Sequence, residues 1–248
     1  MKDLIPASVL VLGATGMTGR KLVGHLLASS HVGTVHIVGR RSAGEEERKG
    51  WTHPEKLKES IVNMDKLDDS EQVFSGHSIA YCCLGTTRAQ AGSAEEFVRI
   101  DKDIPLQAAR LFHKGETQTT QSDKNLQHFV LLSSTGSNAS SWFLYPKTKG
   151  ELEQQIIGMG FNRVSIVRPG LLDYRPDQRP TRRIMEEWMM PILDVVAPRS
   201  AILGVTQLGK AMCKMGEQWL DEFSKNNDTL SKVQVYENND ILNLAEQE

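Results

Sequence analysis

The chain lacks a disulfide framework, a membrane-spanning run and a metal-binding pattern. Its three cysteines, an odd number without framework spacing, argue against a disulfide scaffold and fit a reducing compartment; they are Cys82, Cys83 and Cys213. No uncharged apolar run approaches the roughly 18 residues of a transmembrane helix, so we expect no integral membrane segment. The seven histidines form no His-Glu-x-x-His pattern and no Cys-x-x-Cys motif accompanies them, so we expect no metal.

An excess of charge of either sign is also missing. Lys and Arg number 29 against 31 Asp and Glu, which gives a net charge of −2. Nucleic-acid-binding domains are usually strongly basic, so no nucleic-acid partner is expected. Apolar residues make up 39% of the chain, which indicates a globular protein rather than a disordered one. Pro6 interrupts the N-terminal apolar stretch and disfavours a secretory signal peptide, so we expect a cytoplasmic protein.

What the sequence does contain is an alternation of short β-branched apolar runs with helical patterns. This alternation is typical of a parallel sheet with crossover helices. The expected strands cover 8–13, 34–39, 60–64, 79–84, 129–132 and 164–167. The expected helices cover 20–29, a long segment around 97–111 that Pro105 should kink or divide, 146–159, 181–190 and 206–223.

Two segments interrupt this alternation. Residues 42–58 are highly charged and stand where a second crossover helix would be, and residues 115–127 are polar without periodicity, as in a mobile surface loop. No repeat or linker divides the chain. We therefore expect an α/β fold, a Rossmann-type doubly wound parallel sheet, as one NAD(P)-binding domain over 1–248. Its core would span 8–170, with a small C-terminal extension on the substrate side at 171–248.

A glycine-rich turn is the strongest local signal. Gly13, Gly16 and Gly19 stand directly after a strand pattern and before an amphipathic helix, the context that dinucleotide binding requires. Gly13 permits the tight turn, Gly16 lets the backbone approach a pyrophosphate, and Gly19 lets helix and strand pack closely. The N–H groups at the start of the helix would bind phosphate.

The residues after the second expected strand indicate which dinucleotide binds. NAD-selective sites usually carry an acidic residue there, whereas this chain has Arg40 and Arg41. Guanidinium groups form bidentate bonds to a phosphate, so we predict NADP as cofactor, although two exposed arginines can also occur by coincidence. Asp65, after the third strand, is placed to accept a hydrogen bond from the adenine amino group.

A Tyr-x-x-x-Lys element opens the helix after the fifth strand. Tyr145 and Lys149 are four residues apart, so they share one helix face, and Pro146 places Tyr145 at the helix start. An ammonium group nearby would help the phenol to exchange a proton with a carbonyl or alcohol oxygen. Ser134, in Ser133-Ser134-Thr135 at the end of the fifth strand, could bind the same oxygen. The pattern also occurs by chance, but its position after a dinucleotide motif favours catalysis.

Several segments together carry a likeness to a known family. They are GATGMTGR at 13–20, IVGRR at 37–41, CCLGTTRAQAG at 82–92, FVRIDKD at 97–103, LLSSTG at 131–136, the element at 145–151 and VRPGLL at 167–172. With them the sequence resembles the atypical short-chain dehydrogenases/reductases, in particular the Tat-interactive-protein-like oxidoreductases. The likeness spans nearly all of 8–180, and the C-terminal third matches weakly.

The resemblance implies an NADP-binding Rossmann fold with assigned residues. The pyrophosphate would lie on Thr15, Gly16, Met17 and Thr18, and the 2′-phosphate on Arg40 and Arg41. Leu84 and Gly85 would flank a ribose, Tyr145 and Lys149 would be the catalytic pair, and Leu172 and Arg179 would lie near the nicotinamide and the substrate. Asp101 stands where relatives often carry a helix asparagine.

Two functions follow from these expectations. The first is an NADP(H)-dependent oxidoreductase that transfers hydride between the nicotinamide and a carbonyl or alcohol substrate, with Tyr145, Lys149 and Ser134 as catalytic residues. The second is an NADP(H)-sensing regulatory protein that acts through a protein partner with little turnover. Trp142-Phe143 and the Met-rich 184–190 could form an apolar surface for such a partner, although pocket wall or core is the commoner role. Monomer and homodimer both remain open.

Overall fold

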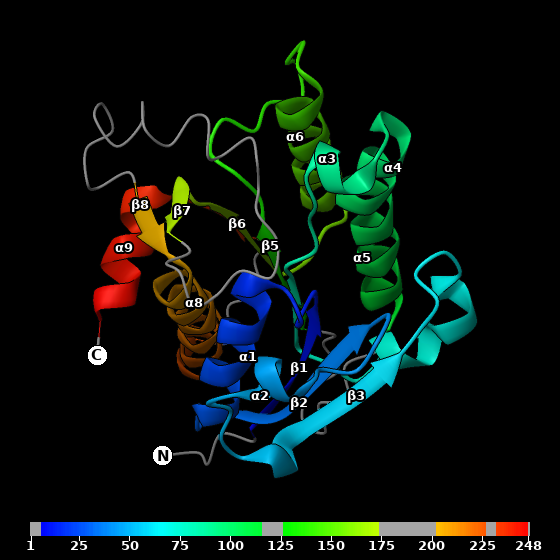
Figure 1. Cartoon of the computed structure of the whole chain (residues 1–248). Helices are drawn as coiled ribbons and strands as arrows, with labels where there is room; N and C mark the ends of the chain where they lie inside the picture. The colour runs from blue at the N-terminus through cyan, green and yellow to red at the C-terminus, as the bar shows by residue number, and fades with distance from the viewer. Residues whose placement is uncertain (1–5, 116–125, 174–201, 227–231, 248) are drawn as a thin grey trace.

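A parallel sheet forms the centre of the molecule (Figure 1). The computed structural model describes residues 6–115, 126–173, 202–226 and 232–247. The seven strands are hydrogen-bonded in the order β3-β2-β1-β4-β5-β6-β9, each pair parallel. They are β1 (Ala7–Leu12), β2 (Val32–Gly39), β3 (Leu57–Ile61), β4 (Ile79–Cys82), β5 (His128–Leu132), β6 (Arg163–Arg168) and β9 (Lys232–Glu237). The expected α/β doubly wound fold is confirmed.

Helices cover both faces of the sheet. One face is packed by α1 (Met17–Ala28), α8 (Val205–Asn226) and α9 (Asn238–Glu246), and the other by α5 (Ile104–Lys114) and α6 (Leu144–Ile157). Side chains of β1 alternate between the two apolar clusters, because successive residues of a strand point to opposite faces. Strands buried on both sides explain why their sequences read as continuous apolar runs.

The strand order reverses at β1. The chain runs from β1 outward through β2 to β3, and then returns to β4 on the other side of β1. In open α/β sheets a crevice forms at the carboxyl ends of the strands beside such a reversal, and ligands bind there. The expected glycine turn follows β1, and Leu84-Gly85 follows β4, so both lie at this crevice.

The long helix expected around Pro105 is divided, as the sequence predicts. α4 (Ala94–Val98) leads into a π-helical turn (Arg99–Asp103), and α5 begins at Ile104. Pro105 has no N–H, so the carbonyl of Asp101 has no donor four residues later and the helix widens there. In this π-helical turn the side chain of Asp101 points into the protein, where it is fully buried.

Other expectations need correction. The third strand covers Leu57–Ile61, not 60–64, because the apolar Val62 and Met64 are buried in the connection that follows the strand. The sequence did not predict β9, nor the two-stranded sheet of β7 (Leu171–Asp173) and β8 (Ile202–Gly204). The helix expected at 206–223 is α8. The helix expected at 181–190 and most of the expected loop at 115–127 lie outside the described residues.

The charged segment 42–58 packs over α1 without forming a long crossover helix. Besides the first two residues of β3, it contains α2 (Glu45–Arg48) and a short 3-10 turn at Pro54–Lys56. Trp51 holds this segment against α1. Its indole N–H donates to the Arg20 carbonyl at 2.9 Å, and its ring packs closely on Gly24, since a Cβ there would lie 3.3 Å from Trp51 Cδ1. In the described parts of the chain, we find no helix with the length and apolar character needed to cross a membrane.

Candidate active site

The turn after β1 is built so that only glycine fits at two positions. Gly13 has φ of +78°, and a Cβ there would lie 2.6 Å from the Cys83 carbonyl oxygen. A Cβ at Gly19 would lie 2.1 Å from the carbonyl oxygen of Gly13. Gly16 caps α1, so the N–H groups of the first helical turn, from Met17 and Thr18 onward, have no partner within the helix. This end of α1 suits an anionic phosphate group.

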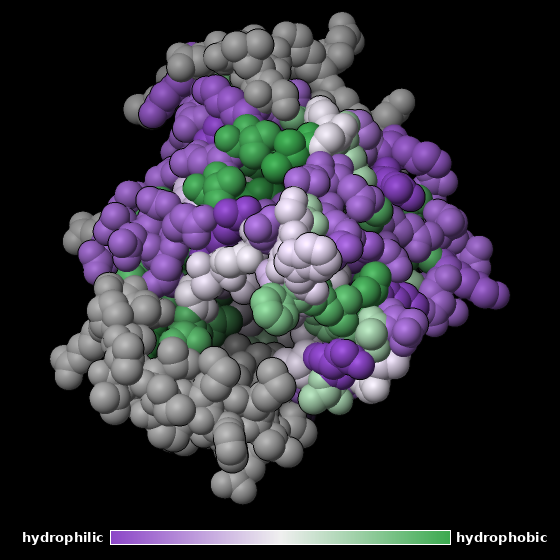
Figure 2. All heavy atoms as spheres, turned by 90° about the horizontal axis from the view of Figure 1, so that it is seen from above, coloured by the Kyte–Doolittle hydropathy of each residue, from purple (hydrophilic) through white to green (hydrophobic). Residues whose placement is uncertain are grey.

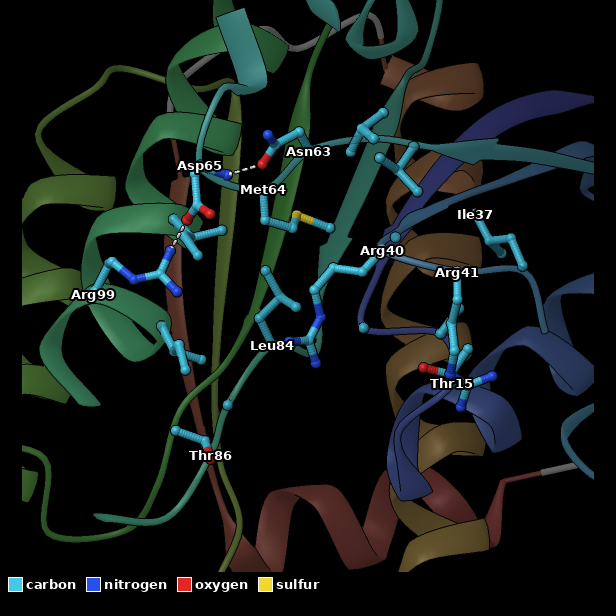
Figure 3. A pocket seen from close by; sticks show the side chains of 18 of the residues that line it. Thr15, Ile37, Arg40, Arg41, Asn63, Met64, Asp65, Leu84, Thr86 and Arg99 are labelled. Atoms are coloured by element: carbon cyan, nitrogen blue, oxygen red, sulfur yellow. Dashed lines mark hydrogen bonds and ion pairs between the residues drawn. The ribbon is translucent and has the colours of Figure 1, made fainter. Parts of the chain in front are cut away.

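A cavity of about 670 Å³ extends from this turn along the carboxyl ends of β2 and β4 (Figure 3). The expected cofactor residues Gly13, Thr15, Arg40, Arg41, Asp65, Leu84 and Gly85 all line it. Residues that sequence reasoning did not single out also line it, among them Asn63, Met64, Thr86, Gln90, Arg99 and Ile100. The glycine turn, the start of α1 and a basic corner formed by Arg40 and Arg41 meet at this cavity. Together they fit the phosphate groups of a dinucleotide.

The two arginines of the basic corner differ in their partners. Arg40 extends into the cavity (Figure 3), and the described part of the chain offers it no hydrogen bond or ion pair. Arg41 Nη2 lies 2.5 Å from Glu47 Oε1, and Arg41 Nη1 donates to the Ser42 carbonyl at 3.0 Å. The hydrogen bond from Arg41 is the main cause that lowers the pKa of Glu47. Arg41 therefore has a direct ion pair in the protein, whereas Arg40 has the longer-range electrostatic attraction of Glu96.

Asp65 is already paired at the far end of the cavity. One of its carboxylate oxygens forms an ion pair with Arg99, and its N–H donates to Asn63 Oδ1 at 2.9 Å (Figure 3). A role of Asp65 toward an adenine stays a prediction. Arg99 could not be predicted as the partner of Asp65, because the two residues are 34 positions apart.

A buried ion pair adjoins the other end of the cavity. Lys149 Nζ of α6 lies 2.8 Å from Asp101 Oδ1, and both side chains are almost fully buried. The Thr86 N–H donates to Asp101 Oδ2 at 2.7 Å. Gly85 lies against the pair, because a Cβ there would be 3.6 Å from Lys149 Nζ. Burial alone would lower the pKa of Lys149, but the charges of Asp101 and Tyr145 outweigh it and the pKa is raised.

Tyr145 lies at the start of α6, one turn before Lys149, as the spacing predicts. Its side chain is 44% exposed, and its ring packs on the buried Phe97 of α4 with centroids 5.8 Å apart. Phe97 thus supports one side of the phenol while the other remains open to solvent. The structure brings Tyr145, Lys149, Asp101 and Gly85 to one place.

The three hydroxyls after β5 have different surroundings. Ser133 is buried, donates to Glu153 and lies 3.0 Å from Ser137 Oγ, so its hydroxyl is part of the packing. Ser134 is half-buried, and within the described residues its hydroxyl donates to the Thr135 carbonyl at 3.2 Å. No described contact joins Ser134 to Tyr145.

Two expected residues lie toward the C-terminal part. Leu172 belongs to β7, where it pairs with Leu203 of β8 and packs against the apolar cluster of α8. Arg179 lies outside the described residues.

Comparison with known proteins assigns this site to a family. Residues 8–98 match the family model of the semialdehyde dehydrogenase NAD binding domain. Protein HTATIP2 from Rattus norvegicus is 37% identical over 200 residues, which is 80% of this chain and 77% of the relative. The chain belongs to the HTATIP2 family. This family is the Tat-interactive-protein-like branch of the atypical short-chain dehydrogenases/reductases, so the resemblance seen in the sequence is confirmed.

The chain is also similar to a protein named fmp52, mitochondrial, from Aspergillus niger, which is 32% identical over 183 residues, 72% of this chain and 73% of the relative. Two solved structures share the fold. A short chain dehydrogenase/reductase from Saccharomyces cerevisiae has a TM-score of 0.63 at 14% identity, covering 93% of this chain and 96% of that one. UDP-glucuronic acid 4-epimerase from Bacillus cereus, in complex with NAD, has a TM-score of 0.63 at 13% identity, covering 93% and 76%. This HTATIP2-family chain therefore has an NAD(P)-binding Rossmann fold of the oxidoreductase type.

Proposed function

We propose that this HTATIP2-family protein is an NADP(H)-dependent oxidoreductase that transfers hydride between the nicotinamide and a carbonyl or alcohol substrate. One observation carries the proposal: a buried Lys149, paired with Asp101, lies one helical turn from Tyr145 at one end of a cavity whose other end holds Arg40. A lysine kept charged in the interior next to a half-exposed phenol serves proton transfer better than packing.

In this proposal the parts of the cofactor would lie along the cavity. The pyrophosphate would lie at the start of α1, on the backbone of Thr15, Gly16, Met17 and Thr18. Arg40, with Arg41 beside it, would bind the 2′-phosphate through charge-assisted hydrogen bonds. Leu84 and Gly85 would flank a ribose, and Leu172 and Arg179 would lie toward the nicotinamide and the substrate.

The chain's own residues would handle the proton. A bound reduced nicotinamide supplies the hydride. Tyr145 would donate its hydroxyl proton to the carbonyl oxygen and then regain one from water, which reaches its exposed side. Lys149 would bind ribose hydroxyls and favour negative charge on the phenol, while Ser134 would polarise the carbonyl. In alcohol oxidation the same groups would act in reverse.

A second candidate is a sensor that reports NADP(H) occupancy to a protein partner. Trp142, which is 99% exposed, and the exposed Phe143 stand three and two residues before Tyr145 and would suit such a contact. Figure 2 shows one face of the molecule, where apolar side chains lie in groups among polar ones. The small-molecule site and the partner surface would then adjoin each other. We propose a cytoplasmic location for either function, although the fungal relatives are named mitochondrial.

Replacing Tyr145 by Phe tests the enzyme directly. The variant keeps the ring on Phe97 but loses the proton donor, so kcat should fall by at least about 100-fold while NADPH binds nearly as tightly. Calorimetry measures the binding, and NADPH oxidation over a panel of aldehydes, ketones and quinones measures the turnover. Unchanged turnover in the variant would rule out the role of Tyr145. Tight NADPH binding by the unaltered protein with no oxidation across the panel would favour the sensor.

A further inference from the structure

Gly85 adjoins both the cavity and the buried ion pair of Lys149 and Asp101. It lines the cavity, and a Cβ added there would lie 3.5 Å from Asp101 Oδ1 and 3.6 Å from Lys149 Nζ. Among the described residues, no other atom beyond the chain neighbours of Gly85 comes within 4 Å of that position. The missing side chain therefore leaves a small recess that is bordered by two charged groups.

The fold itself does not require a glycine at this position. Gly85 has no left-handed φ, and both contacts of an added Cβ would be ordinary van der Waals distances. At Gly13 and Gly19, by contrast, a Cβ would lie 2.6 and 2.1 Å from backbone oxygen atoms. An alanine would fit at position 85, so the open recess has no purpose in packing. A ligand that enters it from the cavity would give it one.

The ammonium group beside the recess is held in a fixed position. Lys149 Nζ lies 2.8 Å from Asp101 Oδ1, with the two side chains 5% and 1% exposed. Asp101 in turn accepts the Thr86 N–H on its other oxygen at 2.7 Å, and its backbone belongs to the π-helical turn at Arg99–Asp103. An ammonium group has three N–H donors, and one carboxylate oxygen takes one of them. Donors of Lys149 therefore remain for a hydroxyl that enters the recess.

We propose that Gly85 and Asp101 are positioning residues for the cofactor: Gly85 keeps the recess open from the cavity to Lys149 Nζ, and Asp101 holds Nζ beside it. The group that enters is a hydroxyl of the ribose next to the nicotinamide, which accepts a hydrogen bond from the ammonium. The inference rests on the proposed function and adds to it which ribose lies over Gly85. Lys149 is one helical turn from Tyr145, whereas Arg40 would take the adenosine side.

The test compares the binding of two ligands to the full chain by calorimetry. NADPH carries both riboses, whereas adenosine 2′,5′-bisphosphate has the adenosine ribose and two phosphates but no nicotinamide ribose. Gly85→Ala fills the recess and should weaken NADPH binding about 10-fold or more, as expected for the loss of a hydrogen bond to a charged group. Binding of adenosine 2′,5′-bisphosphate should not change. The melting temperature should stay within about 3 °C, because the added methyl group meets only ordinary contacts.

A second background separates this role from simple crowding of the cofactor. Asp101→Asn/Lys149→Met removes both buried charges together, so neither is left unpaired. Adding Gly85→Ala to this background should cause no further loss of NADPH affinity, since the ammonium is already gone. A methyl group that clashed with the cofactor directly would weaken NADPH in both backgrounds, and that result would overturn the role of Gly85.

Asp101→Asn alone tests the role of Asp101. The amide oxygen can still accept the Thr86 N–H, but the ion pair that holds Lys149 is lost. NADPH affinity should fall toward that of Asp101→Asn/Lys149→Met, while adenosine 2′,5′-bisphosphate binds as before. A purely structural role would lower the melting temperature and leave the ratio of the two affinities unchanged. That outcome would overturn the role of Asp101.

Gly158→Ala is the matched control for a glycine-to-alanine change. Gly158 ends α6 with φ of −69°, and a Cβ there would lie 3.4 Å from the Gln154 carbonyl oxygen. Neither affinity should change in this variant. Undiminished NADPH binding by Gly85→Ala would refute the inference, and an unaltered protein that binds neither ligand would refute the cofactor proposal with it. Because only binding is measured, tight NADPH binding without turnover would remove the enzyme proposal and leave this one standing.

Discussion

At the scale of single residues, two neighbours that look equivalent in the sequence have different surroundings. Arg40 and Arg41 both predict a phosphate site, yet Arg41 is paired with Glu47, which also accepts the Gly44 N–H at 2.8 Å. No pattern in the sequence shows this pair, because it depends on how residues 42–47 turn back toward β2. The same limit applies to Asp65 and Arg99, whereas the one-turn spacing of Tyr145 and Lys149 is local and could be predicted.

Arg40 should therefore carry more of the NADP preference than Arg41. Arg40→Ala removes a charge-assisted hydrogen bond of about 1.5–3 kcal/mol and should weaken NADPH binding roughly 10- to 100-fold, with little effect on NADH. Glu47→Gln releases Arg41 and should tighten NADPH binding several-fold. Calorimetry with both nucleotides measures each effect. Equal losses of NADPH and NADH affinity in Arg40→Ala would remove Arg40 from the 2′-phosphate site.

At the scale of elements, local pattern and long-range contact decide different things. The helix around Pro105 divides where the sequence predicts, because proline acts on its own backbone. The strand β9 could not be predicted, since its residues are mostly exposed and the strand it pairs with, β6, is far away in the sequence. The path of segment 42–58 over α1 could not be predicted from the sequence either. Its position depends on Trp51, whose indole lies on α1.

Trp51 offers a test of how that segment is held. Trp51→Ala removes a half-buried ring and its hydrogen bond to the Arg20 carbonyl, and should lower the free energy of unfolding by about 2–3 kcal/mol. Trp51→Phe should cost about 1 kcal/mol, since it loses the hydrogen bond and keeps most of the packing. Urea denaturation measures both. Trp142→Ala is the control and should have almost no effect, because the Trp142 side chain is almost fully exposed. A comparable loss there would show that ring size, not packing on α1, sets the result.

At the scale of the whole molecule, the sheet encloses several histidines that must stay neutral. His36 on β2 is hydrogen-bonded to His77, which stands before β4, with Nδ1 and Nε2 3.2 Å apart. The other ring nitrogen of His36 lies 2.8 Å from Ser60 Oγ, and that of His77 lies 2.8 Å from Ser8 Oγ. Burial, followed by the neighbouring His77, lowers the pKa of His36 to about 4, and burial also lowers the pKa values of His77 and His128. The chain of side chains joins three adjacent strands.

These histidines predict an acid-sensitive fold. In the unfolded chain a histidine takes up a proton near pH 6.5, whereas folded His36 does so only near pH 4. The unfolded state therefore binds more protons between these values, and stability should fall as the pH drops from about 6.5 to about 4. Urea denaturation across this range measures the slope. His36→Gln should make the slope shallower, and an unchanged slope would exclude His36 as a contributor.

The contact between Ser133 and Glu153 has a consequence for how this site can vary. Glu153 lies one turn beyond Lys149 on α6 and accepts the Ser133 hydroxyl. Its carboxylate also forms an ion pair with Arg168 of β6, with Nη2 and Oε2 2.5 Å apart. These contacts hold the helix that carries Tyr145 and Lys149 against β6 and the end of β5. A rotation of this helix about its axis would expose a carboxylate that is now buried. A change in which molecules fit this site must therefore come from the segments opposite α6. The side of the site that carries Tyr145 and Lys149 keeps its position.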